Sequence, residues 1–263
     1  MPFPPTAPLT IHPALAVLEY QLVGYRRVWR GSVFSSFLMP VLFFLGMGVA
    51  VGSYVDRNGG LDIPYLEFIG PGLLAFTGLQ IAMVDSGFPV LGGFKWRRTY
   101  YGIAAAPPRV GDIIAGHLGY VALRVAVGTT AFLIVMVLFG TVSSVWAVVM
   151  PLIAILVGMA VATPMLAYSA SIESPSLMAV MFRFGVLPMM LFSGVFFPVE
   201  QLPAALRPVA YATPLWHGAE LCRAAALGLG TAWPVLAHVG YLELWVVVGF
   251  GLARARFRNR LAR

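Results

Sequence analysis

Long apolar stretches and short polar segments alternate along this chain. Six of the apolar stretches have the length, and the near absence of charge, that a helix needs to cross the hydrocarbon core of a bilayer. The pattern therefore predicts an all-α integral membrane protein with six transmembrane helices, in a single transmembrane domain over residues 1–263. The predicted spans are residues 33–55, 68–84, 113–139, 145–170, 177–197 and 234–253.

The segment before the first span, residues 9–30, is not apolar enough to cross the membrane. Leu15, Leu18 and Leu22 recur at helical spacing on one side, and arginines mark another side. This pattern predicts an N-terminal amphipathic helix in the membrane interface, with its arginines at the lipid headgroups. The alternative is a plain positively charged flank of the first span, which explains the arginines but not the spacing of the leucines.

The segment between the fifth and sixth spans, residues 198–228, combines prolines with apolar side chains. Prolines break a helix when they fall in its interior, so no continuous helix fits here. Because the segment also lacks the polar composition of a soluble loop, we predict a re-entrant helical hairpin on the outer side, with helices near 203–211 and 215–227. The alternative is a hairpin that lies on the membrane without a role in transport. The prolines are Pro198, Pro203, Pro208 and Pro214.

The connection between the second and third spans is basic and aromatic. Residues 94–105 are predicted to form a short cytoplasmic helix that ends before Pro107 and Pro108. A partner that pushed on this helix would move both neighbouring spans, which makes it a candidate contact for a cytoplasmic protein. Contact with lipid headgroups suits the same side chains equally well. They are Phe94, Lys95, Trp96, Arg97, Arg98, Tyr100 and Tyr101.

Composition and charge agree with this topology. The chain is 60% hydrophobic and 10% charged, whereas an ordinary soluble domain has about 25% charged residues. Twelve Lys and Arg residues lie near the side that holds both termini in a six-span chain, against three on the other side. The positive-inside rule then places the N- and C-termini in the cytoplasm. The net charge of +7 thus reflects topology, and we expect no nucleic-acid partner.

Three ionisable side chains fall inside predicted spans, where a charge costs at least about 2.5–3.5 kcal/mol. Arg124 and Glu243 each lie roughly 17 Å from the cytoplasmic end of their span. We predict that these two residues pair across the third and sixth spans, either as a fixed packing contact or as part of a gate. Arg183 is placed nearer the cytoplasmic side, where it would snorkel to the headgroups or meet Glu173.

The sequence contains no constellation of catalytic residues. Its four histidines are scattered, so no metal-ligand spacing appears, and there is no nucleophile motif or phosphate-binding loop. The chain is therefore not expected to be an enzyme by itself, nor to bind a metal or cofactor directly. Active transport would need energy from a partner subunit or an ion gradient.

Two stretches carry a resemblance to a known family. They are SGVFFPVEQLPAALRPVAYATPLWHGAELCRAAALG, at Ser193–Gly228, and YYGIAAAPPRVGDIIAG, at Tyr100–Gly116. With the six-span order and the N-terminal helix, they make the chain similar to the membrane (permease) subunits of type 2 ABC exporters, especially the nodulation-factor and daunorubicin-resistance permeases. The resemblance covers nearly the whole chain.

The resemblance implies a permease subunit in the cytoplasmic membrane of a bacterium. It would associate with a second copy of itself or a related permease, and with separate ABC ATPase subunits that bind ATP and Mg²⁺ and hydrolyse the ATP. Residues 94–105 would be a coupling helix, and residues 9–30, including Arg26 and Arg27, a connecting helix, both against the ATPase. The cargoes of the family are amphiphilic: lipids, lipo-oligosaccharides and hydrophobic drugs.

The resemblance further implies that the outer hairpin roofs an exit path for the cargo. Residues expected at this outer gate are Phe197, Pro198, Glu200, Pro203, Pro214, Trp216 and His217. Two other functions stay open from the sequence alone. One is a gradient-driven secondary transporter that would use Glu243 as its membrane carboxylate, and the other is a non-transporting membrane scaffold.

Overall fold

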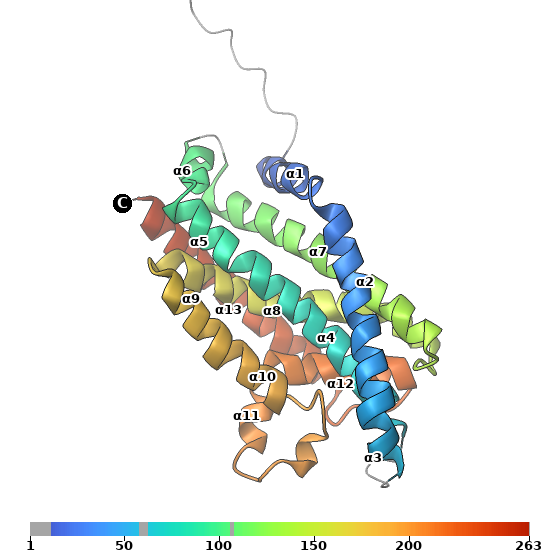
Figure 1. Cartoon of the computed structure of the whole chain (residues 1–263). Helices are drawn as coiled ribbons and strands as arrows, with labels where there is room; N and C mark the ends of the chain where they lie inside the picture. The colour runs from blue at the N-terminus through green and yellow to red at the C-terminus, as the bar shows by residue number, and fades with distance from the viewer. Residues whose placement is uncertain (1–11, 58–62, 106–107, 263) are drawn as a thin grey trace, which may run out of the picture.

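The computed structural model describes residues 12–57, 63–105 and 108–262, which fold into helices without any strand among them (Figure 1). Five helical stretches in this part are long and apolar enough to cross a membrane. An all-helical chain with membrane-spanning helices is thereby confirmed, whereas a sixth span over residues 33–55 stays a prediction. The five stretches are Tyr65–Lys95, Val110–Leu138, Val145–Ser171, Pro175–Phe192 and Val235–Leu261.

The N-terminal part is a short helix followed by a longer run of helical turns. In chain order these are α1 (Pro13–Tyr25), α2 (Trp29–Gly46), the π-helix η1 (Met47–Gly52) and α3 (Ser53–Arg57). A turn at residues 26–28 separates α1 from α2, and the last three elements join without a break, over the region of the first predicted span. The predicted helix of residues 9–30 is thus shorter in the structure, and its start lies outside the described residues.

The second span is longer than predicted and continues toward the basic connection. α4 (Tyr65–Ser86) is followed, after Gly87, by α5 (Phe88–Lys95), and α6 (Thr99–Ala104) comes next. The single helix predicted over residues 94–105 is therefore wrong, because a turn at residues 96–98 divides it. Arg98 in this turn has φ of 51°.

The division has a packing reason. Positions six apart on a continuous helix point about 120° away from each other. With the turn between them, the rings of Phe94 and Tyr100 come together at a centroid distance of 4.7 Å, and both also contact Phe257. Gly93 makes room for Tyr100, since a Cβ at Gly93 would lie 2.6 Å from the tyrosine ring.

The remaining elements complete the bundle. They are α7 (Val110–Leu138), the 3₁₀-helix η2 (Val145–Val149), α8 (Met150–Ser171), α9 (Pro175–Met181), the π-helix η3 (Phe182–Val186), α10 (Leu187–Phe192), the 3₁₀-helix η4 (Val199–Gln201), α11 (Arg207–Tyr211), α12 (Pro214–Leu227) and α13 (Val235–Leu261). α1, α6 and the C-terminal end of α13 lie at one end of the bundle, and α3 and α11 lie at the other (Figure 1).

Several predicted bounds change. The fifth span ends at Phe192, before the predicted end at residue 197, and Gly194 then turns the chain with φ of 69°. The second helix of the outer hairpin is found at Pro214–Leu227, within one residue of its prediction, but the first covers only Arg207–Tyr211. α13 continues through the arginine-rich tail, which the sequence analysis placed beyond the span.

α8 is the central helix, and α4, α7, α12 and α13 all pack against it. Small residues permit this close approach. A Cβ at Gly78 of α4 would lie 2.8 Å from the carbonyl oxygen of Ala154, and one at Gly218 of α12 would overlap Val157. A Cβ at Gly249 of α13 would overlap the Thr163 hydroxyl and the ring of Pro164. α4, α12 and α13 thus each reach α8 through a glycine.

This packing predicts opposite effects for two substitutions in α13. Gly249→Ala inserts a methyl group against Thr163 and Pro164 of α8, and we expect it to destabilise the protein by about 1–3 kcal/mol. Gly251→Ala is the matched control, because a Cβ at Gly251 meets no atom within 4 Å; it is expected to be neutral or slightly stabilising. Thermal unfolding of the purified protein in detergent measures both. Equal unfolding temperatures for the two variants would contradict the close contact.

Candidate functional site

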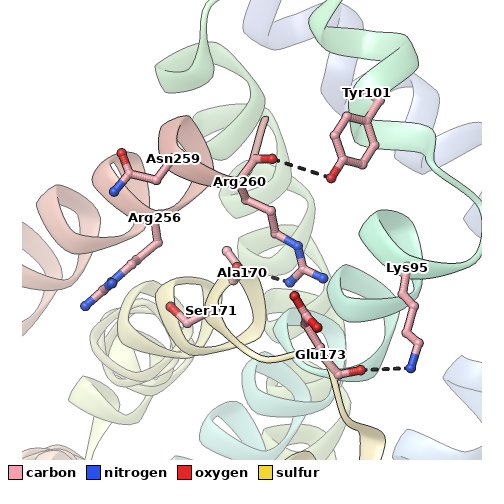
Figure 2. A pocket seen from close by; sticks show the side chains of 8 residues that line it. All are labelled: Lys95, Tyr101, Ala170, Ser171, Glu173, Arg256, Asn259 and Arg260. Atoms are coloured by element: carbon pink, nitrogen blue, oxygen red, sulfur yellow. Dashed lines mark hydrogen bonds between the residues drawn. The ribbon is translucent and has the colours of Figure 1, made fainter. Parts of the chain in front are cut away.

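The end of the bundle that carries α6 is held by Arg260, near the end of α13. Nη1 of Arg260 donates hydrogen bonds to the carbonyl oxygens of Ser169, Ala170 and Ile172, at 3.1, 3.0 and 2.8 Å. Figure 2 shows the bond to Ala170. These carbonyls belong to the last turn of α8, where a helix has no internal donors left and its dipole favours a positive charge. Arg260 therefore caps α8 and fastens α13 to it.

The same arginine holds the basic connection. Its guanidinium lies over the ring of Phe94, 4.7 Å from the ring centroid, and its backbone carbonyl accepts a hydrogen bond from the Tyr101 hydroxyl at 3.4 Å. Lys95 Nζ donates to the carbonyl oxygen of Glu173, at 2.9 Å, just after α8. α5, α6, α8 and α13 are thus joined at one place.

A cavity of about 410 Å³ opens between these helix ends. Figure 2 shows the polar and charged side chains around it, which come from α5, α6, the α8–α9 turn and α13. Three cations and one carboxylate give it a basic character, suited to an acidic surface. The lining residues are Lys95, Tyr101, Ala170, Ser171, Glu173, Arg256, Asn259 and Arg260.

The predicted contact residues of this region divide into two groups. Trp96, Arg97 and Arg98 form the exposed turn between α5 and α6, and Lys95 and Tyr101 are also exposed. Phe94 and Tyr100 are only 3% and 4% exposed, so they hold the segment from inside and present no surface to a partner. Burial also raises the pKa of the Tyr100 phenol, which therefore stays protonated. Arg26 and Arg27 are exposed in the turn after α1.

The charge pair inside the membrane is not the predicted one. Nε of Arg124 on α7 donates to Oδ2 of Asp85 on α4 at 3.0 Å, whereas Glu243 is exposed on α13. We therefore correct the predicted pair of Arg124 and Glu243. The second span was predicted to end just before Asp85, but α4 and α5 continue past it, which places this carboxylate beside Arg124.

α1 takes part in this polar region. The Tyr25 ring lies 4.9 Å from the Arg124 guanidinium, and Nε2 of Gln21 is 3.1 Å from Nδ1 of the buried His117 on α7. Gly116 allows the close contact, because a Cβ there would lie 2.5 Å from the carbonyl oxygen of Ala14. A second cavity, of about 430 Å³, borders these groups between α1, α5, α6 and α7. The contact of Gln21 with His117 was not predicted from the sequence, because the two positions are adjacent only in the fold.

The outer segment is fixed by a pair of histidines. His217 Nε2 lies 3.0 Å from the carbonyl oxygen of Tyr211, and Nδ1 of His217 lies 2.9 Å from Nδ1 of His238 on α13. A carbonyl only accepts, so His217 Nε2 carries the proton; its Nδ1 is then the acceptor of the proton on His238 Nδ1. Tyr241 stacks on His217, with ring centroids 4.0 Å apart. This arrangement requires a neutral His217.

The predicted outer-gate residues lie at different depths in the molecule. Glu200 and Pro203 are exposed, and Phe197 and Pro198 are half-buried. Pro214, Trp216 and His217 are buried where α12 packs into the bundle. The last three therefore anchor the outer segment, and only the exposed part could meet a cargo at the surface.

A family model described as ABC-2 type transporter matches residues 14–227. The chain is 28% identical over 252 residues to Nodulation protein J of Rhizobium leguminosarum bv. viciae, an alignment that covers 95% of each protein. It is similarly 28% identical over 250 residues to Nodulation protein J of Rhizobium meliloti (strain 1021), covering 94% of this chain and 93% of that relative.

The ion pair of Asp85 and Arg124 predicts a coupling between two substitutions. Asp85→Asn and Arg124→Gln should each destabilise the protein, because each leaves a largely buried charge without its partner. The double variant should recover about 1–3 kcal/mol relative to the sum of the single effects. Thermal unfolding in detergent measures this cycle. Arg124→Gln combined with Glu243→Gln is the control cycle, and a larger coupling there would restore the pair that we have corrected.

The histidine pair predicts loss of stability in acid. Burial, and then the nearby His238, lower the pKa of His217 to about 4, against about 6.5 in an unfolded chain. Protons therefore bind more tightly to the unfolded chain, and stability present above pH 6.5 should decline by roughly 1–2 kcal/mol by pH 5. Unfolding temperatures between pH 8 and pH 5 measure this decline. His217→Gln should show a smaller one; an unchanged pH dependence would contradict the assignment.

Proposed function

Because the chain belongs to the ABC-2 type transporter family, we propose that it is the membrane-spanning permease subunit of an ATP-driven exporter in the cytoplasmic membrane of a bacterium. The transporter moves an amphiphilic cargo outward: a lipid, a lipo-oligosaccharide or a hydrophobic drug. A separate ABC ATPase subunit binds and hydrolyses ATP. A second copy of this chain, or a related permease, completes the transporter.

The attachment of α6 to the bundle is the observation that carries this proposal. The turn with Trp96, Arg97 and Arg98 is exposed, yet the residues on either side are fastened to the ends of α8 and α13 through Lys95 and Tyr101. A force applied to the turn therefore passes directly into the two helices that pack along each other in the bundle. That arrangement suits a subunit that is driven by a partner protein.

α1 offers a second attachment point for the same partner. Arg26 and Arg27 are exposed at its end, and the helix is tied to α7 by the contact of Gln21 with His117. Movement of α1 would reach the pair of Asp85 and Arg124 through Tyr25. Both proposed contacts present arginines, so the matching surface of the ATPase subunit is expected to be acidic.

The outer segment fits the role of a roof over the exit path. α12 packs against α4 and α8, and Arg223 Nη2 on this helix donates to the carbonyl oxygen of Gly194 at 2.9 Å. The exposed Glu200 and Pro203 lie in the connection before α11. We propose that α12 stays fixed while this connection borders the exit.

The gradient-driven secondary transporter is the alternative to this proposal. Glu243 forms no salt bridge with Arg124, whose partner is Asp85, so the predicted pair bears on neither function. Membership in the ABC-2 type transporter family favours energy from ATP instead.

Charge reversal at the exposed turn tests the proposed docking. Arg97→Glu with Arg98→Glu should reduce the amount of ABC ATPase subunit that co-purifies with the tagged protein by about tenfold, because like charges would then face each other. Arg57→Glu is the matched control, since Arg57 is exposed at the opposite end of the bundle. Mass spectrometry of the purified complexes measures the ratio of subunits. A wild-type chain that purifies without an ATPase would contradict the proposed function itself.

A further inference from the structure

The fifth membrane stretch, α9–η3–α10, is the least covered of the five described candidates. Only 11% of its most apolar 18-residue segment is buried, against 17–67% of the corresponding segments in the other four stretches. One broad surface of this stretch is therefore exposed along the whole length of the stretch. The exposed apolar ones are Leu177, Val180, Phe184, Leu187 and Leu191.

Arg183 lies on this open surface, at the centre of the stretch. It follows Pro175 by eight residues and precedes Phe192 by nine, so it is roughly 12–14 Å from either end. Snorkelling to the headgroups is a property of residues near the ends of a span. The expectation that Arg183 lies near the cytoplasmic side is therefore corrected, because the helix begins earlier and ends earlier than predicted.

The charge of Arg183 is uncompensated within the described part of the chain, where it forms no salt bridge and no hydrogen bond. A guanidinium cannot lose its proton in a protein. Lipid chains are thus an unsuitable environment for Arg183 in particular, and water or an anion must face it.

The local backbone orients this side chain outward. Phe182 turns toward the bundle and stacks on Phe88 of α5, with ring centroids 6.2 Å apart and planes 12° from parallel. Arg183 and Phe184 follow on the exposed side. The π-helical turn lies just before Pro188, which has no backbone N–H and so removes a helical hydrogen bond. Such π-turns within helices occur frequently at functional sites.

We propose that α9–η3–α10 lines the water-accessible translocation pathway and that Arg183 binds the anionic headgroup of the transported amphiphile. The apolar side chains above and below Arg183 suit the tail of such a molecule, and the guanidinium suits a phosphate, sulfate or carboxylate. This inference rests on the proposed function and narrows its cargo class to anionic amphiphiles.

Accessibility of position 183 tests the pathway. In the complete transporter, reconstituted in vesicles, Arg183→Cys and Phe184→Cys should react with a charged thiosulfonate reagent that does not enter lipid. Met178→Cys, at a fully buried position of the same stretch, and the wild-type chain, whose only cysteine Cys222 is buried, are the controls. Reaction of position 183 with a lipid-soluble maleimide alone would overturn the proposal.

Headgroup selectivity tests the binding. ATP hydrolysis by the complex is measured with lysophosphatidylglycerol, which is anionic, and with lysophosphatidylcholine of the same acyl chain, which is zwitterionic. The wild-type complex should be stimulated at lower concentrations of the anionic probe. Arg183→Gln should raise the half-maximal concentration of that probe about tenfold, the effect of one lost charge-assisted hydrogen bond. Arg183→Lys should keep most of the preference, because it keeps the positive charge.

The outcomes separate this inference from the proposed function. A wild-type complex that prefers the anionic probe, together with an Arg183→Gln complex that prefers it equally, would overturn the role of Arg183 alone. A wild-type complex whose ATP hydrolysis responds to neither probe would contradict export of amphiphiles, and the inference would fall with it.

Discussion

The structure depends on the close approach of neighbouring helices to α8. Within a bilayer the lipid chains are as apolar as the side chains, so helices associate through tight van der Waals contact rather than through exclusion of water. Glycines supply that contact at three places: Gly78 against Ala154, Gly218 against Val157, and Gly249 against Thr163 and Pro164. The central position of α8 follows, and the outer helix α12 is fixed by the same contact as the spans.

The polar groups of the molecule concentrate where this packing ends. Arg260 satisfies the last carbonyls of α8 and brings α13 and the Phe94 ring to the same point. Further into the bundle, Arg124 and Asp85 join α7 to α4, and Tyr25 brings in α1. A force on the exposed turn at residues 96–98 thus enters a connected set of helices. Partner-driven motion of the whole bundle is the mechanical consequence that we propose.

Charges in the membrane stretches have different environments, and these suggest different roles. The charge of Arg124 is compensated inside the bundle by Asp85. Replacement of Arg124 is therefore expected to change the stability of the protein. Arg183 is on an open surface of a thinly covered stretch, and no side chain in the described part of the chain compensates its charge. A charge that the fold leaves uncompensated in this way indicates contact with water, cargo or another subunit.

Much of the fold follows from the sequence because the bilayer imposes a length and an apolar composition on every span. That constraint was enough to place the described membrane stretches and to indicate α12, and the motif at residues 193–228 indicated the family. The partner of Arg124 was a different matter. From the sequence alone, Asp85 and Glu243 could each pair with Arg124. Only the packing of α4 on α7 shows that Asp85 is the partner. The central depth of Arg183 follows instead from where its membrane stretch begins and ends, at Pro175 and Phe192. The division of α5 from α6 and the contact of His217 with His238 were decided by tertiary structure. Each of these depends on which surfaces of two helices meet, and periodicity along one helix carries no information about the other.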